Sequence, residues 1–293
     1  MAHPNRVTSG TLAAHRNAGR AFTAGGIRSF LLSEGDGEPV VCIHGMLGSS
    51  FGYRKVVREL AMRDLRGMAW DLPGFGLADR PENYDYSWTN LGRFCQQAVA
   101  ALGLGRFHLV VHDIGGPVGF ELAAACPGQI ASLTVLNTVV DVTRWRPPWT
   151  MRPFRWPVIG ELWAAGMAPP AFRFLMRLQG IGDISQVSKA ELNTYLELMK
   201  GNDRGRAFLK VSRSAEATAG KQDLYRRVIA GGGPYPVQVV WAGQDPAMPA
   251  ATYGERARAA AGLPAVDTIP GKHFPQEDQA AAIAERVAAI AAA

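Results

Sequence analysis

Residues 109–116, with the sequence LVVHDIGG, constrain the fold of this chain more than any other segment. An apolar run of this length is typical of a buried strand, and the paired glycines Gly115 and Gly116 open a segment with helical character. A strand that turns sharply into a helix needs small residues, because the two backbones approach each other closely. The segment therefore predicts a strand–turn–helix unit with Asp113 in a strained turn.

The residue in this turn decides which chemistry is available. Such a turn usually presents a serine, and here it presents Asp113. A carboxylate attacks saturated carbon to give an ester, whereas its attack on an ordinary ester would give only a less stable anhydride. Asp113 therefore indicates cleavage of a carbon–halogen or epoxide carbon–oxygen bond through a covalent intermediate. The alternative is that Asp113 only caps the helix N-terminus. A serine esterase is disfavoured, because Ser49 and Ser50 fall in a loop and not in a sharp turn between a strand and a helix.

The rest of the chain alternates short apolar runs with segments of helical periodicity. This pattern predicts an α/β fold with a mostly parallel, doubly wound sheet. The alternation stops between residues 140 and 232, which contain several helical stretches, many prolines and no convincing strand. It resumes with a strand-like run at 237–241. We therefore predict a discontinuous core, residues 1–139 and 233–293, with an α-helical cap at 140–232 inserted after about the sixth strand.

Composition and charge narrow the classes of partner. The net charge of +6 is concentrated at residues 140–232, which hold 15 Lys/Arg against 8 Asp/Glu. This excess indicates solvated helix faces or attraction of an anionic partner, and no aromatic-interleaved basic run suggests nucleic acid. No apolar stretch approaches the roughly 20 residues that span a bilayer. Residues 1–26 lack the apolar block of a secretory signal. We expect a cytoplasmic protein with no nucleic-acid or membrane partner.

Two further residues complete a candidate triad with Asp113. His273 lies in a loop between the last predicted strand and the last predicted helix, where it would activate water against the Asp113 ester. Asp245 follows the strand that ends at Trp241 and would hold the tautomer of His273. His273 could instead be structural, and Asp245 a simple turn residue before proline. Asp141, after the preceding strand, is the reserve candidate for the acid.

The loop after the strand at residues 40–43 is a candidate oxyanion hole. It reads His44-Gly45-Met46-Leu47-Gly48, and the backbone N–H of Met46 would pair there with that of Ile114. The alternative is a turn that only ends the strand. Because the donors are backbone groups, the side chains of Met46 and Ile114 are free to vary for oxyanion binding.

Together these motifs resemble the α/β-hydrolase superfamily, and within it the haloalkane dehalogenase and epoxide hydrolase branch. The matching segments cover the chain from about residue 27 to the end, more weakly in the cap: His44-Gly45, residues 71–76 (DLPGFG), His112-Asp113-x-Gly115-Gly116, Gln244-Asp245-Pro246 and residues 271–278 (GKHFPQED). The resemblance implies an α/β-hydrolase fold in which Asp113 is the nucleophile, His273 the base and Asp245 the acid. It implies no cofactor or metal.

The departures from the family concern the leaving group. Haloalkane dehalogenases typically have a tryptophan after the nucleophile and many have an asparagine after His-Gly, whereas this chain has Ile114 and Met46. Val111 also fills a position that is usually glycine. Candidate halide donors in the cap are the tryptophans, which could equally be packing residues: Trp145, Trp149, Trp156 and Trp163. An epoxide hydrolase would need tyrosines as proton donors, for which Tyr195 and Tyr225 are available.

We therefore expect a hydrolase that forms and hydrolyses an alkyl-enzyme ester, with haloalkane dehalogenase-like and epoxide hydrolase activities both open. A ligand-binding protein that has lost turnover is the alternative of another class. The expected partners are a small apolar or weakly polar organic substrate and water, and the expected state is a monomer or homodimer.

Overall fold

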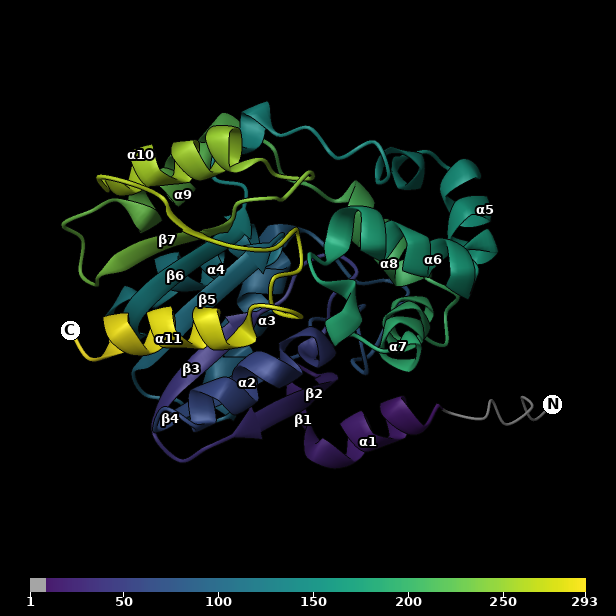
Figure 1. The fold of residues 1–293 in the computed structure, drawn as a ribbon, viewed down its shortest axis with the longest axis horizontal. Helices are drawn as coiled ribbons and strands as arrows, with labels where there is room; N and C mark the ends of the chain where they lie inside the picture. The colour runs from purple at the N-terminus through teal and green to yellow at the C-terminus, as the bar shows by residue number, and fades with distance from the viewer. Residues whose placement is uncertain (1–8) are drawn as a thin grey trace.

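The computed structural model describes residues 9–293, which build one eight-stranded sheet with the order β1-β2-β4-β3-β5-β6-β7-β8 (Figure 1). β2 runs antiparallel to both β1 and β4, and all other neighbouring strands are parallel. The strands are β1 Gly19–Ala24, β2 Ile27–Glu34, β3 Glu38–Ile43, β4 Leu65–Trp70, β5 Phe107–Asp113, β6 Ile130–Thr138, β7 Val237–Ala242 and β8 Asp267–Ile269. The predicted α/β fold with a mostly parallel sheet is confirmed.

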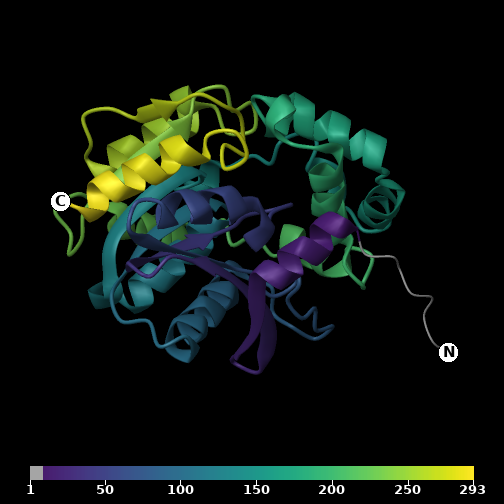
Figure 2. The ribbon, with the colours of Figure 1, turned by 60° about the horizontal axis from the view of Figure 1, so that its bottom comes forward.

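Helices cover both faces of this sheet (Figures 1 and 2). α2 and α11 pack on one face, and α3, α4, α9 and α10 form the layer on the other. The helices are α1 Gly10–Ala18, α2 Arg54–Ala61, α3 Trp88–Ala101, α4 Gly115–Ala125, α5 Ile159–Gly166, α6 Pro169–Leu175, α7 Lys189–Lys200, α8 Arg206–Arg213, α9 Ala219–Ile229, α10 Glu255–Ala261 and α11 Ala280–Ala291. Single helical turns occur at Ser50–Tyr53, Pro127–Gln129, Val142–Arg144, Arg152–Arg155, Met176–Gly180, Ile184–Gln186 and Ala250–Gly254.

The strands read as continuous apolar runs because they are buried on both sides. Successive side chains of a strand point to opposite faces. Val40 and Cys42 accordingly pack with α2 and α11, whereas Val41 and Ile43 join the core on the side of α3 and α4. Every residue of β5 is buried, so this central strand is a rigid support for whatever follows it.

Between β6 and β7 the chain forms helices and turns, with no strand among residues 139–236. We call residues 140–232 the cap segment. Its helices α5 to α8 lie to one side of the sheet (Figure 1), but α9 returns to pack against α4 and α10. The last helix of the predicted cap therefore belongs, by its packing, to the helical layer of the core. The chain leaves the sheet after β6 and returns to it at β7.

The start of the chain is more structured than its polar composition suggested. The sequence analysis assigned no element before residue 27, yet α1 packs against α7 and β1 forms a hairpin with β2. β1 is an edge strand with several exposed residues, so its sequence lacks the apolar run by which the other strands are recognised. Residues 1–8, part of the stretch interpreted as lacking a signal, lie outside the described residues. No helix within residues 9–293 is long and apolar enough to cross a membrane.

Candidate active site

Three predicted site residues meet at the carboxyl ends of neighbouring parallel strands. Asp113 ends β5, Asp245 follows β7, and His273 follows β8. His273 Nε2 lies 3.3 Å from Asp113 Oδ2, and its Nδ1 lies 2.8 Å from Asp245 Oδ2. The carboxyl ends of the strands in an α/β sheet form one edge, which is where ligands usually bind. The fold thus joins residues that are far apart in the sequence.

Asp113 occupies the sharp turn that the glycines predict. Its φ is +54°, in the left-handed region that a non-glycine residue rarely adopts. A Cβ on Gly45 would lie 2.3 Å from atoms of Asp113, and one on Gly115 would lie 2.3 Å from the carbonyl oxygen of Ile43. The hydroxyl of Thr138 donates a hydrogen bond to the Asp113 carbonyl oxygen. The turn therefore has a tightly packed surrounding that holds Asp113 in its strained conformation.

The departure at Val111 has a structural explanation. This valine stands where the family usually has glycine, and its side chain points toward α4. A Cβ on Gly119 would lie 2.3 Å from Val111 Cγ1. The glycine on the helix leaves the space that the valine fills, so the strand and helix approach each other as closely as the turn requires.

The predicted oxyanion donors lie beside the Asp113 carboxylate. The backbone N–H of Met46 donates to Asp113 Oδ1 over 2.6 Å, and the N–H of Ile114 also interacts with this carboxylate. The two oxygens of Asp113 are therefore in different surroundings. Oδ1 faces backbone N–H groups, and Oδ2 faces the imidazole of His273.

Asp245 is held by more groups than the sequence analysis identified. Its Oδ1 accepts hydrogen bonds from the N–H groups of Ala247 and Met248, at 2.7 and 3.0 Å. Its Oδ2 accepts from Asn137 Nδ2 at 2.8 Å, in addition to facing His273. Asn137 is fully buried at the end of β6. The only sequence signal for its role was its position as a polar residue closing an apolar strand.

Asp141, the reserve candidate for the acid, lies elsewhere. Its carboxylate accepts a hydrogen bond from Arg226 Nε at 2.9 Å, on α9. This ion pair ties the start of the cap segment to α9. Two strand ends are available to supply a triad acid, and only the tertiary structure decides that β7 provides it.

Two other histidines, His112 and His44, lie near the triad without being part of it. His112 Nε2 lies 2.7 Å from the carbonyl oxygen of His273 and donates to it, which supports the backbone of the His273 loop. Burial and the nearby His273 charge lower the pKa of His112 to about 4. His44 Nε2 accepts from the N–H of Leu72 at 3.0 Å, and burial lowers its pKa. Both imidazoles are therefore neutral structural groups at pH 7.

A cavity opens over this constellation, between the strand ends and the cap segment. About 870 Å³, including its opening to solvent, is free of atoms. From the core of the fold, Asp113 and His273 contribute titratable side chains to the wall of this cavity. The remaining wall is mostly apolar, and its polar side chains are Thr150, Arg155, Gln179 and Ser212. A mostly apolar cavity with a few convergent polar groups is typical of a site for a small organic molecule.

A family model described as the alpha/beta hydrolase fold matches residues 38–280. The chain belongs to the alpha/beta hydrolase fold family. The match covers the strands that carry the constellation, and it confirms the superfamily to which the sequence motifs are similar.

Parts of this alpha/beta hydrolase are similar to individual known proteins. A haloalkane dehalogenase of Mycobacterium marinum is 34% identical over 160 residues, which are 50% of this chain and 54% of that protein. A cis-3-alkyl-4-alkyloxetan-2-one decarboxylase of Shewanella oneidensis is 39% identical over 111 residues, 36% of this chain and 34% of that protein. The matches thus span from a third to about half the length of these relatives. The crystal structure of Cfl2 from Burkholderia cenocepacia has a TM-score of 0.77 at 25% identity and covers 92% of this chain and 94% of that one.

The structure separates the six candidate leaving-group donors of this alpha/beta hydrolase. Trp145 borders the cavity, and its buried Nε1 has no hydrogen-bond partner within residues 9–293. Trp149 is 62% exposed and does not line the cavity. The hydroxyl of Tyr195 donates to Glu277, and that of Tyr225 donates to Glu121 over 2.9 Å, both away from the cavity. The structure therefore places Trp149, Tyr195 and Tyr225 outside the wall of this cavity, where their side chains serve the surface and the packing of helices. Trp156 and Trp163 are also exposed.

Sequence reasoning missed Gln179, which lies in the helical turn Met176–Gly180 of the cap segment. The Thr150 hydroxyl donates to Gln179 Oε1 over 2.9 Å, which leaves the amide N–H groups of this cavity residue without a protein partner in the described chain. The backbone of the same turn accepts from the N–H groups of His273 and Phe274, at 3.3 and 2.7 Å. The cap segment therefore supports the His273 loop directly.

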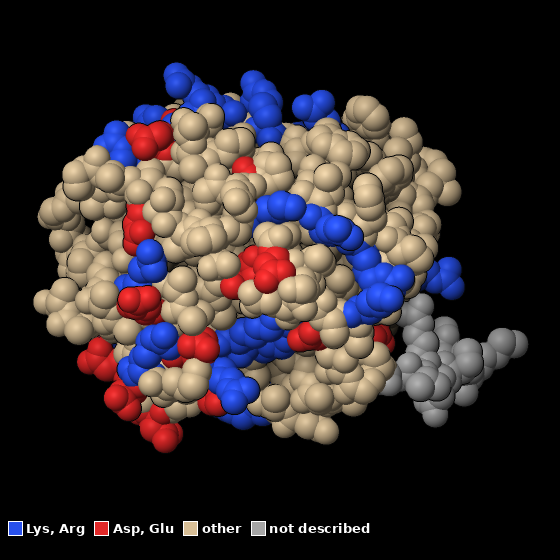
Figure 3. Space-filling model, viewed as in Figure 1, with Lys and Arg blue, Asp and Glu red and all other residues tan. Residues whose placement is uncertain are grey.

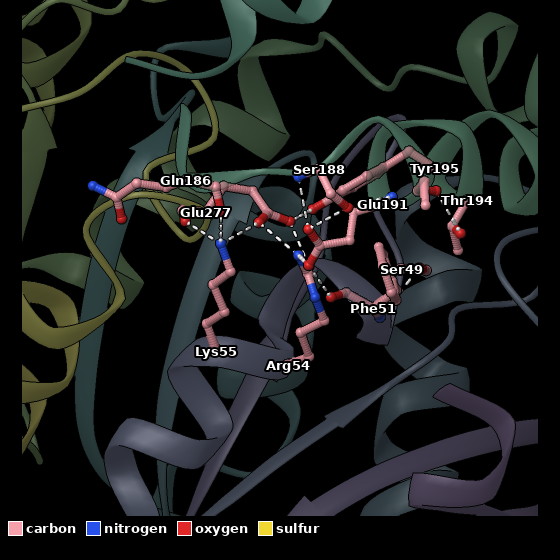
Figure 4. A network of polar contacts seen from close by, with 11 residues as sticks. Ser49, Phe51, Arg54, Lys55, Gln186, Ser188, Glu191, Thr194, Tyr195 and Glu277 are labelled. Atoms are coloured by element: carbon pink, nitrogen blue, oxygen red, sulfur yellow. Dashed lines mark hydrogen bonds and ion pairs between the residues drawn. The ribbon is translucent and has the colours of Figure 1, made fainter. Parts of the chain in front are cut away.

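The loop is also fixed from the other side by Glu277 (Figure 4). Arg54 donates to both Glu277 oxygens, at 2.5 and 2.9 Å, and Lys55 Nζ lies 3.2 Å from Oε2. Tyr195 donates to the same carboxylate, and Arg54 also reaches Glu191 on α7 at 2.6 Å. The Glu277 side chain is fully buried. The network joins α2, α7 and the His273 loop through Glu277, which gives this residue a structural role.

The charges of the triad shift its pKa values in opposite directions. For His273, burial favours the neutral form, but the Asp245 charge and the hydrogen bond with Asp113 outweigh it and raise the pKa to about 10. For Asp113 and Asp245, burial would raise the pKa, but the His273 charge and hydrogen bonds lower it. The group is therefore an imidazolium between two carboxylates at pH 7.

This arrangement predicts how stability depends on pH. Because the pKa of His273 is higher in the folded chain than its ordinary 6.5, the folded state retains a proton that the unfolded state loses. The stabilisation is complete below about pH 6.5 and is lost as the pH rises toward 10. We expect the free energy of unfolding from urea titrations to fall between pH 7 and pH 9.5, and to fall less steeply in Asp245→Asn.

The difference between the two slopes is the quantity to measure, because the unfolded chain also loses cysteine protons in this range, whereas burial raises the pKa of Cys42 and Cys95 in the folded chain. Asp245→Asn keeps the shape of the side chain and removes the largest charge that raises the His273 pKa. Identical slopes in the two proteins would contradict the assigned charge state.

Proposed function

We propose that this alpha/beta hydrolase cleaves a carbon–halogen bond of a small, largely apolar organic substrate, with Asp113 as nucleophile. The observation that carries the halide assignment is the indole N–H of Trp145, which borders the same cavity as Asp113 and has no protein partner in residues 9–293. A buried N–H without a partner costs about 1–3 kcal/mol. A departing halide ion would supply the missing acceptor.

In the first step, Asp113 Oδ2 attacks the carbon that carries the halogen. Oδ1 is held by the Met46 N–H at 2.6 Å, so Oδ2 is the oxygen available for reaction. The new carbon–oxygen bond forms as the carbon–halogen bond breaks, and the halide leaves with the bonding electron pair. Trp145 would donate to the halide, with the amide of Gln179 as a second donor. Trp145 and Gln179 would thus replace the side-chain halide donors that are missing at Ile114 and Met46.

In the second step, His273 activates water against Cγ of the ester. Esterification removes the Asp113 charge, one of the interactions that raise the His273 pKa, and so favours the neutral imidazole needed as a base. His273 takes one proton from water while the hydroxide adds to Cγ. The negative charge then develops on Oδ1, which already accepts the Met46 N–H, and the Ile114 N–H is the second proposed donor. Before it acts as a base, His273 releases its own proton to solvent. When the intermediate collapses, the alkoxide leaves with the proton of the added hydroxyl, so the alcohol departs and the Asp113 carboxylate is regenerated beside the protonated His273.

Epoxide opening is the second candidate for the same nucleophile, and the geometry favours it less. It would need a hydroxyl donor for the opening oxygen, but the two tyrosines considered for this role donate to Glu277 and Glu121. The serine alternative is weaker still. Ser50 lies in the turn Ser50–Tyr53, where its hydroxyl contacts His15 Nε2 at 3.2 Å.

The test is product formation by the wild-type protein from separate pools of bromoalkanes, terminal epoxides and dialkyl oxetan-2-ones, the last because one relative is named for that substrate. Bromide release that is absent in Asp113→Asn would support the proposal. Diol formation or lactone consumption without bromide release would keep the nucleophile and overturn the halide assignment. No product from any pool would favour a ligand-binding role.

Trp145 has its own prediction. Trp145→Phe keeps an aromatic ring in the cavity wall and removes the N–H. Removing one preorganised donor of this kind typically costs about 100-fold in rate. We expect kcat/KM for bromoalkanes to fall by about that factor, measured by bromide release. Trp149→Phe is the matched control, because Trp149 lies outside the cavity. Equal effects of the two substitutions would contradict the assignment.

A further inference from the structure

The exposed apolar side chains of this protein gather in one part of the chain. Within residues 9–293, nine large apolar side chains are exposed, and eight of them lie between residues 149 and 178. These eight, which we call the cap patch, are Trp149, Trp156, Val158, Ile159, Leu162, Trp163, Phe174 and Leu178. Their exposed fractions range from 46% to 69%. Scattered apolar residues on a surface are ordinary, but a concentration of this kind marks an interaction site.

The spacing within the patch places its members on shared helix faces. Around α5, Val158 and Leu162 are four residues apart, and so are Ile159 and Trp163. Phe174 at the end of α6 and Leu178 in the turn that follows it are also four residues apart. Residues four apart lie one above the other on a helix. The exposed apolar groups are therefore short stripes rather than isolated side chains.

The charge of the segment that carries the cap patch is mostly positive. Residues 142–182 contain six arginines and a single acid, Glu161, and Glu161 is occupied by Arg213 at 2.8 Å. Arg152, Arg155 and Arg177 are exposed and make no ion pair or side-chain hydrogen bond within the described chain. In the view of Figure 3, the surface over α5 shows no acidic side chain. The patch is thus apolar, rich in tryptophan and surrounded by free cations.

We propose that the cap patch docks onto an anionic lipid surface. Tryptophan and leucine beside arginine are typical of segments that lie in the headgroup region, where the rings enter the boundary and the guanidinium groups bind phosphates. The bound state is peripheral, since no helix in the described chain can span a bilayer. It differs from the expectation, drawn from the sequence, that the protein has no membrane partner.

The position of the cap patch relative to the cavity gives this docking a consequence. Arg155 is exposed and also lines the cavity, and Pro148 and Thr150, which flank Trp149, line it as well. An apolar substrate dissolved in the bilayer would therefore reach Asp113 with little passage through water. This consequence rests on the proposed function, whereas the docking itself does not.

A second copy of the chain fits the patch less well. In a two-fold symmetric contact, each patch meets the same patch of its partner. The arginines would then face arginines without acids to balance them, and like charges oppose association. An anionic surface complements the same arginines.

The experiment is co-sedimentation of the full chain with vesicles of phosphatidylcholine alone and with 30% phosphatidylglycerol. We expect binding to the anionic vesicles that weakens in high salt. Arg152→Gln/Arg155→Gln/Arg177→Gln should lower the partition coefficient by about 100-fold, because each cation near an anionic surface contributes roughly a factor of five. Trp156→Ser/Leu162→Ser/Trp163→Ser should abolish the shift of tryptophan fluorescence that accompanies insertion.

The matched control is Arg20→Gln/Arg28→Gln/Arg106→Gln, which makes the same change in charge on exposed residues outside the cap segment. Equal loss of binding in the two arginine variants would overturn the proposal, as would equal binding to both kinds of vesicle. A stable dimer in solution that the serine variant dissociates would also overturn it, in favour of self-association. Because no outcome uses catalysis, failure here is distinct from failure of the proposed function.

Discussion

Replacing His273 by glutamine should stop the proposed reaction halfway and leave the substrate bound to Asp113 as an ester. The attack by Asp113 needs no proton transfer, so alkylation should proceed, whereas hydrolysis loses its base. A positioned general base contributes about 10²- to 10⁴-fold, and we expect the ester to decay slower by a factor in this range. The measurement is the mass of the intact protein after incubation with bromoalkanes. The expected gain equals the alkyl group without bromine, located on Asp113 by peptide mapping.

Asp113→Asn is the control for this trap. Asparagine keeps an oxygen that can accept the Met46 N–H, so the turn should fold, but its amide cannot form the alkyl ester. No mass gain is expected in Asp113→Asn or in the double variant with His273→Gln. If His273→Gln folds and the wild-type protein turns over, the lack of an adduct would show that His273 is not specific to the second step.

Glu277→Gln should have the largest effect on stability. Its carboxylate is fully buried and bound by Arg54, Lys55 and Tyr195. The substitution keeps the shape of the side chain but leaves two cations without their main partner. Breaking a buried ion pair in this way costs about 3–5 kcal/mol. We expect a loss of that size in the free energy of unfolding, measured by urea titration monitored by circular dichroism.

Glu161→Gln provides the comparison for an ion pair at the surface. Glu161 pairs with Arg213 at 2.8 Å, but the acid is 46% exposed. Exposed pairs contribute at most about 1 kcal/mol, so this substitution should change stability little. A Glu277→Gln protein as stable as Glu161→Gln would mean that Arg54 and Lys55 are stabilised by water or by a change in side-chain position. It would also mean that the network does not fix the His273 loop.

Local patterns were sufficient for the fold and for the chemical type of the candidate site. The apolar runs predicted the inner strands β2 to β7 because a strand covered on both faces requires them. The sharp turn at Asp113 could be predicted because the backbone of another strand lies close to it, which restricts a neighbouring position to glycine, as at Gly115. Edge strand β1 escaped notice because an exposed strand carries no such restriction.

The candidate leaving-group donors were not separable by sequence. Trp145 and Trp149 are four residues apart and chemically identical, yet one borders the cavity and the other is exposed. Tyr195 and Tyr225 have hydroxyl groups suited to proton donation, but these groups donate to acids that other segments bring near. Which polar atom is satisfied depends on contacts between residues 82 and 104 positions apart, and no local pattern records such contacts.

The sequence by itself therefore determined the layered α/β fold, and it predicted the nucleophile position at Asp113, because each depends on a restriction that acts over a few residues. Tertiary structure decided that Asp245 and not Asp141 meets His273, and that Asn137 and Glu277 hold the pair in place. It also decided which cap side chains face the cavity and which form the cap patch. These outcomes depend on how helices without strong local signals pack on one another, and packing is a property of the whole folded chain.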